Sequence, residues 1–563
     1  MDLLMGIDVG TSGIKIVLID RAGTIVASRT REYPLYTPKP GWAEQNPADW
    51  WNAARQGVTA LLSENSTFKK SVRAVGLTGQ MHGAVFLDAG NRVVCPALLW
   101  CDQRTFRECG EITRRVGPKR VLAITGNPVL TGFQAPKILW LRNNHPAAFR
   151  TVRKILLPKD YLRFLLTGDF AGDVSDASGT SLFDVRKRVW SDEILETLNI
   201  PRALLPVPFE SPVITGRISR AAARETGLPE GTPVVAGAGD QAAGGIANGI
   251  VEPGLVSVSI GTSGVVFACA DRPTTDPKGR LHTFCHAVPG KWHLMGVTLS
   301  AGGSFRWFRD TLCREEQKEA KRQKKDPYEI LTGEAAKIPP GSDDLFFLPY
   351  LTGERCPYPD PFARGVFFGL SLGHTKAHMT RALMEGVTFS LKDCMDIMEE
   401  IGLPLGKTFR TSGGGARSDF WCRLQADVFN RTVARVSSGG DPSFGAAIIA
   451  GAGVEIFPDI PAACRTLIHN RDQFTPDRKH AMIYGSIHPL YRKLYGDLRT
   501  TFALVAAATA ARRTAKDRHS TDSEEEPHGR NAVADGHRQT KRIHRHRQDE
   551  GRHGRHPRQR KNT

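Results

Sequence analysis

DVGTSG at residues 8–13 is followed 251 positions later by SIGTSG at residues 259–264. Apolar, strand-like runs flank both copies, at residues 3–9 and 14–19 and again at residues 255–260 and 265–270. An apolar run, a glycine-bearing turn and a second apolar run are typical of a β-hairpin. The repeat therefore predicts a chain of two similar halves, each opening on a hairpin. Two unrelated glycine hairpins are the alternative interpretation.

Both predicted turns have the chemistry to hold phosphate. Glycines let backbone N–H groups close on an anion, and the hydroxyl groups add donors. The two copies differ at one position, where Asp8 of the first corresponds to Ser259 of the second. A carboxylate beside bound phosphates needs a cation between them, so Asp8 is a candidate Mg²⁺ ligand.

The length of the repeat predicts where the folded body ends. A chain of 563 residues is long enough for several domains. Two units of 251 residues reach to about position 502, and the apolar pattern stops near Leu504. We therefore predict one domain at residues 1–250, a second at 251–505, and a tail at 506–563.

The tail is basic and poor in large apolar residues. Between Arg512 and Thr563, 15 Lys and Arg residues stand against 8 Asp and Glu, within a chain whose net charge is +18. Such a segment cannot bury enough surface to offset its ordering entropy, so we expect it to be disordered. Nucleic-acid binding through the tail is an alternative function. The positive charge of the tail by itself predicts only a weak attraction to polyanions.

Cysteine usage and hydropathy indicate a cytoplasmic protein. The ten cysteines include no C-x-x-C pair, which is typical of reduced thiols. The first apolar run contains Asp8 and follows no basic stretch, so we interpret it as a strand and not as a signal peptide. The apolar stretch at residues 502–511 is too short to span a bilayer, and we expect no membrane partner.

Asp240 is the first candidate for the catalytic residue. It follows the short predicted strand 234–237 and lies within GAGDQAAGG at residues 237–245. Small neighbours let a substrate approach its carboxylate, which could accept a proton from a sugar hydroxyl as that oxygen attacks phosphorus. Gln241 could hold neighbouring hydroxyls. The alternative is that Asp240 only caps the following helix.

Three further motifs follow predicted strands. GQMHG at residues 79–83 and WCDQR at residues 100–104 supply imidazole, amide and indole groups that suit a small polyol. GGG at residues 413–415 lies between a strand predicted at 408–412 and a helix predicted at 419–429, where a nucleotide could approach the backbone. Strand ends are where α/β folds bind ligands. A structural turn is the alternative for the glycines.

These motifs together resemble the FGGY family of carbohydrate kinases, and most of all its xylulokinase branch. The similarity covers about residues 3–500. Besides the stretches already quoted, it rests on FQAPKILWL from Phe133, LPKDYL from Leu157, FLPYLTGER from Phe347 and GVFFGL from Gly365. Two departures concern sugar preference: Gln241 and Gln134 stand where the family pattern has other residues.

The resemblance implies an α/β fold of two ribonuclease-H-like domains, of the actin and hexokinase type, with a cleft between them. It implies ATP-dependent phosphorylation of a ketopentose, here the 5-hydroxyl of D-xylulose, with Mg²⁺ as cofactor. Asp240 would be the base and Asp8 would hold Mg²⁺. The sugar side would consist of Met81, His82, Trp100, Asp102, Asp240 and Gln241. The nucleotide side would consist of Thr11, Ser12, Lys15, Gly261, Thr262, Ser263, Gly414, Gly415 and Ser418.

Other interpretations stay open. A different FGGY kinase could act on ribulose, a hexulose or a polyol. An ATP-binding protein without enzymatic activity, similar to actin or a chaperone, is less compatible with GQMHG and GDQAAG. The expected partners are a small ketose and ATP, and a homodimer is left open.

Overall fold

The computed structural model describes residues 2–522. The chain divides into two compact units after Leu504. The first unit contains two seven-stranded mixed sheets, one in each half of the repeat. Among the described residues, no helix is long and apolar enough to cross a membrane.

The first sheet has the strand order β13-β14-β5-β1-β2-β3, and β15 also pairs with β5. Its apolar strands are buried on both faces, as β1 shows with six of its seven residues buried. The strands are β1 (Leu3–Val9), β2 (Gly13–Ile19), β3 (Ile25–Glu32), β5 (Val72–Gly79), β13 (Ile214–Arg217), β14 (Pro233–Val235) and β15 (Ala238–Gly239).

The second sheet has the order β18-β19-β17-β16-β22-β23-β24. Its strands are β16 (Gly254–Ile260), β17 (Gly264–Ala270), β18 (His282–Cys285), β19 (Trp292–Thr298), β22 (Leu405–Gly413), β23 (Thr432–Val436) and β24 (Asn470–Phe474). The buried helix α15 (Lys376–Glu400) lies in the core on this half.

The two halves repeat the same strand pairing. β1 pairs antiparallel with β2 and parallel with β5, and β16 pairs antiparallel with β17 and parallel with β22. Both predicted hairpins are therefore present. Their glycines do not take left-handed backbone angles. They are needed for packing instead, because a Cβ on Gly13 would lie 2.6 Å from the Arg31 carbonyl oxygen and one on Gly264 2.7 Å from Thr298 Oγ1.

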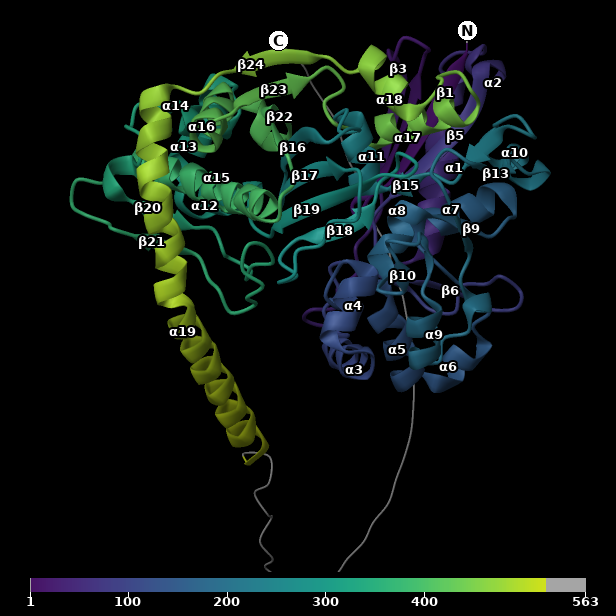
Figure 1. Ribbon diagram of the computed structural model, residues 1–563, viewed down its shortest axis with the longest axis horizontal. Coiled ribbons are helices and arrows are strands. Elements are labelled where there is room, and N and C mark those ends of the chain that lie inside the picture. Colours follow the sequence, from purple (N-terminus) through teal and green to yellow (C-terminus); the bar gives the residue numbers. More distant parts are fainter. Residues whose placement is uncertain (1, 523–563) are drawn as a thin grey trace, which may run out of the picture. The chain divides into compact units, whose positions relative to one another are not determined.

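Two helices join the halves. α11 (Asp240–Ala247) and α17 (Pro442–Gly453) lie between the two sheets in Figure 1. α17 comes from the second half of the chain, yet it packs on β1 and β5 of the first sheet and on α11. The contact is backbone to backbone, because a Cβ on Gly6, Gly76 or Gly445 would collide with a facing carbonyl oxygen.

The remaining helices cover the sheets and form the region that follows β7 (Ala97–Leu98). Those used below are α1 (Pro47–Ser63), α3 (Phe106–Val116), α5 (Gln134–Asn144), α7 (Pro158–Thr167), α8 (Val174–Ala177), the 3₁₀ turn η1 (Ser178–Thr180), α12 (Gly302–Leu312), α14 (Pro327–Ala335), the 3₁₀ turn η4 (Gly414–Arg417) and α16 (Asp419–Phe429).

The last helix passes the predicted boundary of the folded body. α19 (Arg478–Asp522) continues beyond residue 505, where we expected the tail to begin. The run 503–511 contains six alanines, and alanine is the strongest helix former, which accounts for the extension. The expectation of disorder for residues 523–563 falls outside the described part of the chain.

Candidate functional site

The first group of site residues gathers at the ends of three neighbouring parallel strands. β1, β5 and β15 run side by side, with Val9 opposite Gly79 and Gly79 opposite Gly239. The chain leaves these strands as the first GTSG turn, as Gln80-Met81-His82 and as Asp240. Carboxyl ends of adjacent parallel strands are where α/β folds place their ligand sites. Segments as far apart in the sequence as Asp8 and Asp240, 232 positions, thus meet at one sheet edge.

Asp240 occupies the first turn of α11 but is not its cap. Gly239 is the N-cap residue, and the structure records no side-chain capping bond there. Burial raises the pKa of Asp240 to about 6, and the backbone N–H of Gln241 acts in the opposite direction. A carboxylate with this pKa is largely ionised at neutral pH and still basic enough to accept a proton.

Asp8 lies in a cluster of carboxyl groups. Its Oδ1 is buried and accepts no hydrogen bond in the described part of the chain. Burial first, and then the negative charges of Asp240 and Asp441, raise the pKa of Asp8 to about 8, while Lys15 acts in the opposite direction. The unpaired Oδ1 of Asp8, whose negative charge is disfavoured by those of Asp240 and Asp441, suits a divalent cation, whose charge would offset this repulsion.

Asp441 is a member of this cluster that the sequence analysis missed. It caps α17, accepting hydrogen bonds from the backbone N–H and the hydroxyl of Ser443 through Oδ1, and its Oδ2 forms an ion pair with Lys15. The signal was present in the sequence, since Gly-Gly-Asp-Pro after a strand is a typical helix start. Lys15 thus contacts a carboxylate from the second half of the chain.

On the sugar side, His82 has a defined tautomer. Its Nδ1 lies 2.7 Å from the carbonyl oxygen of Gly179, so Nδ1 carries the proton and donates it. The imidazole stacks on Phe133 at 4.4 Å between ring centres. Burial lowers the pKa of His82 to about 3, so the ring is neutral and its Nε2 is a free acceptor. Met81 packs beside it, against Gly179 and Gly239.

Trp100 and Asp102, both from the WCDQR stretch, form hydrogen bonds with different parts of the protein. Trp100 Nε1 donates to Thr11 Oγ1 at 2.9 Å, which connects WCDQR to the first GTSG turn. Asp102 is fully buried, and its oxygens accept hydrogen bonds from Ala43 N–H and from Arg104. This carboxylate holds a loop in place, and its contact with the sugar stays a prediction.

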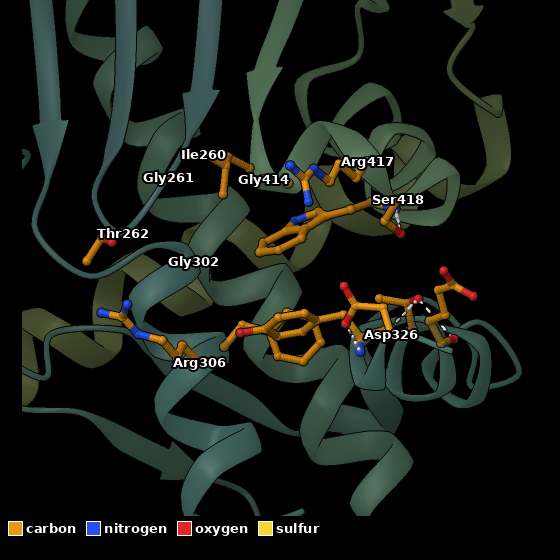
Figure 2. Close-up of a pocket in the computed structure, with 15 residues that line it drawn as sticks. Ile260, Gly261, Thr262, Gly302, Arg306, Asp326, Gly414, Arg417 and Ser418 are labelled. Carbon is orange, nitrogen blue, oxygen red and sulfur yellow. Dashed lines mark hydrogen bonds between the residues drawn. The ribbon is translucent and has the colours of Figure 1, made fainter. Parts of the chain in front are cut away.

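The second group of site residues lines a cavity of about 530 Å³ beside the second GTSG turn. Figure 2 shows Arg417 and Ser418 on one side of it and Arg306 and Asp326 on the other. Its aromatic members contact one another: the Phe305 ring centre lies 4.9 Å from that of Tyr328 and 5.7 Å from that of Trp421. A cavity with aromatic lining beside a glycine turn suits a nucleotide base.

The structure brings five of the nine predicted nucleotide residues to this cavity. They are Gly261, Thr262, Gly414, Gly415 and Ser418. Ser263 does not line it. Thr11 and Ser12 belong to the first turn, and Lys15 belongs to β2. Sequence reasoning missed Phe305, Tyr328 and Trp421, which come from α12, α14 and α16, and no local motif marks them.

Arg355 is another residue that the sequence analysis passed over. Among residues 2–522, no hydrogen bond or ion pair of its guanidinium group is found. Burial lowers its pKa, and its charge contributes to the lowered pKa values of His82 and His282. A positive charge therefore lies near the sugar-side histidines.

Comparison with known proteins gives matches over the whole body of the chain. Residues 3–247 match the N-terminal domain, and residues 256–454 the C-terminal domain, of the FGGY family of carbohydrate kinases. The xylulose kinase of Lactococcus lactis is 40% identical over 496 residues, which are 88% of this chain and 97% of that protein. The gluconokinase of Bacillus subtilis is 30% identical, with 89% and 97% covered. The structure of a xylulose kinase from Rhodospirillum rubrum matches with a TM-score of 0.81 and 30% identity, over 89% of this chain and all of that one.

Proposed function

Since the chain belongs to the FGGY family of carbohydrate kinases, which transfer a phosphoryl group to a sugar hydroxyl, we propose that it phosphorylates D-xylulose on its 5-hydroxyl with ATP. The observation that carries this proposal is the placement of Asp240. Its carboxylate, with a pKa of about 6, shares one sheet edge with the neutral His82 and with Asp8. The xylulose kinases among the relatives support the choice of sugar.

In the proposed reaction, Asp240 is the general base. Its carboxylate accepts the proton of the 5-hydroxyl as that oxygen forms a bond to the γ-phosphorus of ATP. The bond from the γ-phosphorus to the β–γ bridging oxygen breaks, and ADP leaves with that electron pair. His82 presents Nε2 as an acceptor to another sugar hydroxyl, because its Nδ1 proton is donated to Gly179.

The nucleotide is proposed to lie between the two GTSG turns. Its base would enter the cavity lined by Tyr328 and Trp421, and its phosphates would reach toward Thr262 and Thr11. Mg²⁺, when bound, would neutralise phosphate charge, and Asp8 with its unpaired Oδ1 is the residue proposed to hold it. Lys15 is placed to contact phosphate once its pairing with Asp441 is released.

One observation favours a second candidate, a sugar acid such as gluconate. The guanidinium of Arg355 has no recorded partner within residues 2–522 and lies near the sugar-side histidines, where it could pair with a carboxylate. The gluconokinase relative agrees with this possibility. The two candidates differ in charge and are easily separated.

The deciding experiment measures ADP release from Mg-ATP with D-xylulose, D-ribulose, D-gluconate, glycerol and no sugar. We expect the highest kcat/KM with D-xylulose. A higher value with D-gluconate would favour the second candidate, and equal release with and without sugar would refute a sugar kinase. Asp240→Asn should keep sugar binding and lose about 10²–10⁴-fold in kcat. Near-normal turnover by this variant would remove Asp240 from the role of base.

A further inference from the structure

The segment Asp173–Thr180, which comprises α8 and η1, is buried beneath the candidate site. Its polar side chains are almost completely inaccessible: Asp173, Ser175, Asp176, Ser178 and Thr180 each have 0% exposure. Polar side chains are rarely buried without a specific structural purpose, because an unpaired polar atom is costly inside a protein.

The segment contacts the chain immediately before Asp240. The backbone N–H of Gly239 donates a hydrogen bond of 3.1 Å to Ser175 Oγ. The same hydroxyl donates to the carboxylate of Asp173 at 2.9 Å. Gly239 is the N-cap residue of α11, and Asp240 is the first residue of that helix. The Ser175 hydroxyl therefore fixes the position of the helix start and, through it, the position of the Asp240 side chain.

Four residues further on, the segment contacts His82. The carbonyl oxygen of Gly179 accepts the Nδ1 proton of the imidazole at 2.7 Å. A Cβ added at Gly179 would lie 2.5 Å from that nitrogen and 3.1 Å from Met81 Cε. Only glycine therefore lets the histidine and methionine keep their places at the sugar side.

A buried ion cluster anchors the segment. Lys159 Nζ lies 2.5 Å from Asp160 Oδ1, 3.6 Å from Asp173 Oδ1 and 3.7 Å from Asp176 Oδ2. Burial opposes the charge on Lys159, but the three carboxylates prevail and hold its pKa above the usual value. Lys159 of α7 thereby contacts the N-cap residue of α8, Asp173, and Asp176 within α8, which anchors the segment.

Building on the proposed function, we propose that residues 173–180 form a positioning element with two separable actions. Ser175 fixes the position of the base, Asp240, through its hydrogen bond with the Gly239 N–H. Gly179 fixes the position of the sugar-contacting residue, His82, through its carbonyl oxygen. Neither residue touches the substrate. Because the two contacts are made by different residues, Ser175 and Gly179, each can be altered while the other remains.

The test compares Ser175→Ala and Gly179→Ala with a control, Ser390→Ala. Ser390 is equally buried but lies on α15, and its hydroxyl has no partner among the described residues. Steady-state ADP release is measured well below each variant's Tm. Ser175→Ala should lower kcat about tenfold with KM for sugar and ATP unchanged, because the base moves relative to the reacting oxygen. Gly179→Ala should raise KM for sugar about tenfold with a smaller effect on kcat.

Rescue separates positioning from general stability. Ser175→Thr keeps the hydroxyl and should recover most of kcat, whereas loss of packing alone would not be restored by it. Wild-type kcat in Ser175→Ala, the same loss in Ser390→Ala, or equal changes of kcat and KM in both segment variants would overturn the proposal. A wild-type enzyme without sugar-dependent ADP release would instead refute the proposed function. A variant that fails to fold is replaced by Ser175→Cys, for which a weak thiol acceptor predicts an intermediate kcat.

Discussion

Gly6→Ala should weaken both the fold and the site, because it acts on the contact between α17 and the first sheet. A Cβ at this position would lie 2.9 Å from the amide nitrogen of Ala447 and closer still to the carbonyl oxygen of Ser443. Non-bonded atoms in ordinary contact lie about 3.5–4.0 Å apart, so the Ala447 nitrogen alone requires α17 to move by ~0.6 Å, and the closer Ser443 oxygen requires more than twice that shift. Both facing atoms belong to helix backbone and cannot turn aside as a side chain could.

The displacement reaches the site because α17 begins at Asp441. Overpacking of this kind typically costs about 1–3 kcal/mol, so the Tm should fall. The shift would also separate Asp441 from Lys15 and disturb the carboxylate cluster around Asp8. A misplacement of about 1 Å can cost 10²-fold in rate, and we expect a loss of roughly 10-fold to 10²-fold in kcat/KM.

The assay combines thermal melting with sugar-dependent ADP release, and Gly110→Ala serves as the control. Gly110 lies within α3, and nothing stands within 4 Å of a Cβ placed there. Alanine should therefore stabilise this helix by about 0.5–1 kcal/mol and leave the rate unchanged. If Gly6→Ala melted and reacted like the wild type, the close contact between α17 and β1 would not be the rigid support described above.

Three further predictions concern ionisation, the cation and the chain end. The base must be ionised, so kcat/KM should rise from acid pH and level off above about pH 6, the pKa of Asp240; a flat profile between pH 5 and 7 would contradict this. Asp8 has a pKa of about 8, so Mg²⁺ affinity, followed by calorimetry, should strengthen as pH rises toward 8. Folding raises the pKa of Asp8, so its contribution to the free energy of unfolding falls as pH rises from about 4 to 8. The variant Asp8→Asn should therefore have a higher Tm than the wild type at pH 7 without Mg²⁺. The same variant should bind Mg²⁺ more weakly. A chain ending at Asp522 should keep sugar-dependent ADP release, since every site residue named above precedes it. A large loss would give residues 523–563 a part in the reaction.

Strongly patterned local elements were predictable from the sequence. The first strand was expected at residues 3–9 and the helix after GGG at 419–429, and both have those bounds in the structure. β1 is a mostly apolar run that Gly10 follows, and α16 starts at a serine cap. The placement of Asp240 at a strand end followed in the same way from local signals.

Features assembled by packing were not predictable in this way. Phe305, Tyr328 and Trp421 lie on three helices, and only the tertiary fold places them around one cavity. Asp102 follows a strand as expected, but Arg104, two residues on, takes up its carboxylate. A local motif predicts where a residue lies along the chain. Which groups form hydrogen bonds with its side chain depends on the tertiary fold.

The crossing of α17 onto the first sheet affects the order in which the protein can fold during synthesis. The face of β1 and β5 that holds Leu4 and Ala74 is covered by residues 442–453, about 200 residues after β15 leaves the ribosome. At translation rates of about 5–20 residues per second, that face waits roughly 10–40 s for its partner. The first sheet can therefore complete its packing only after α17 of the second half has been synthesised.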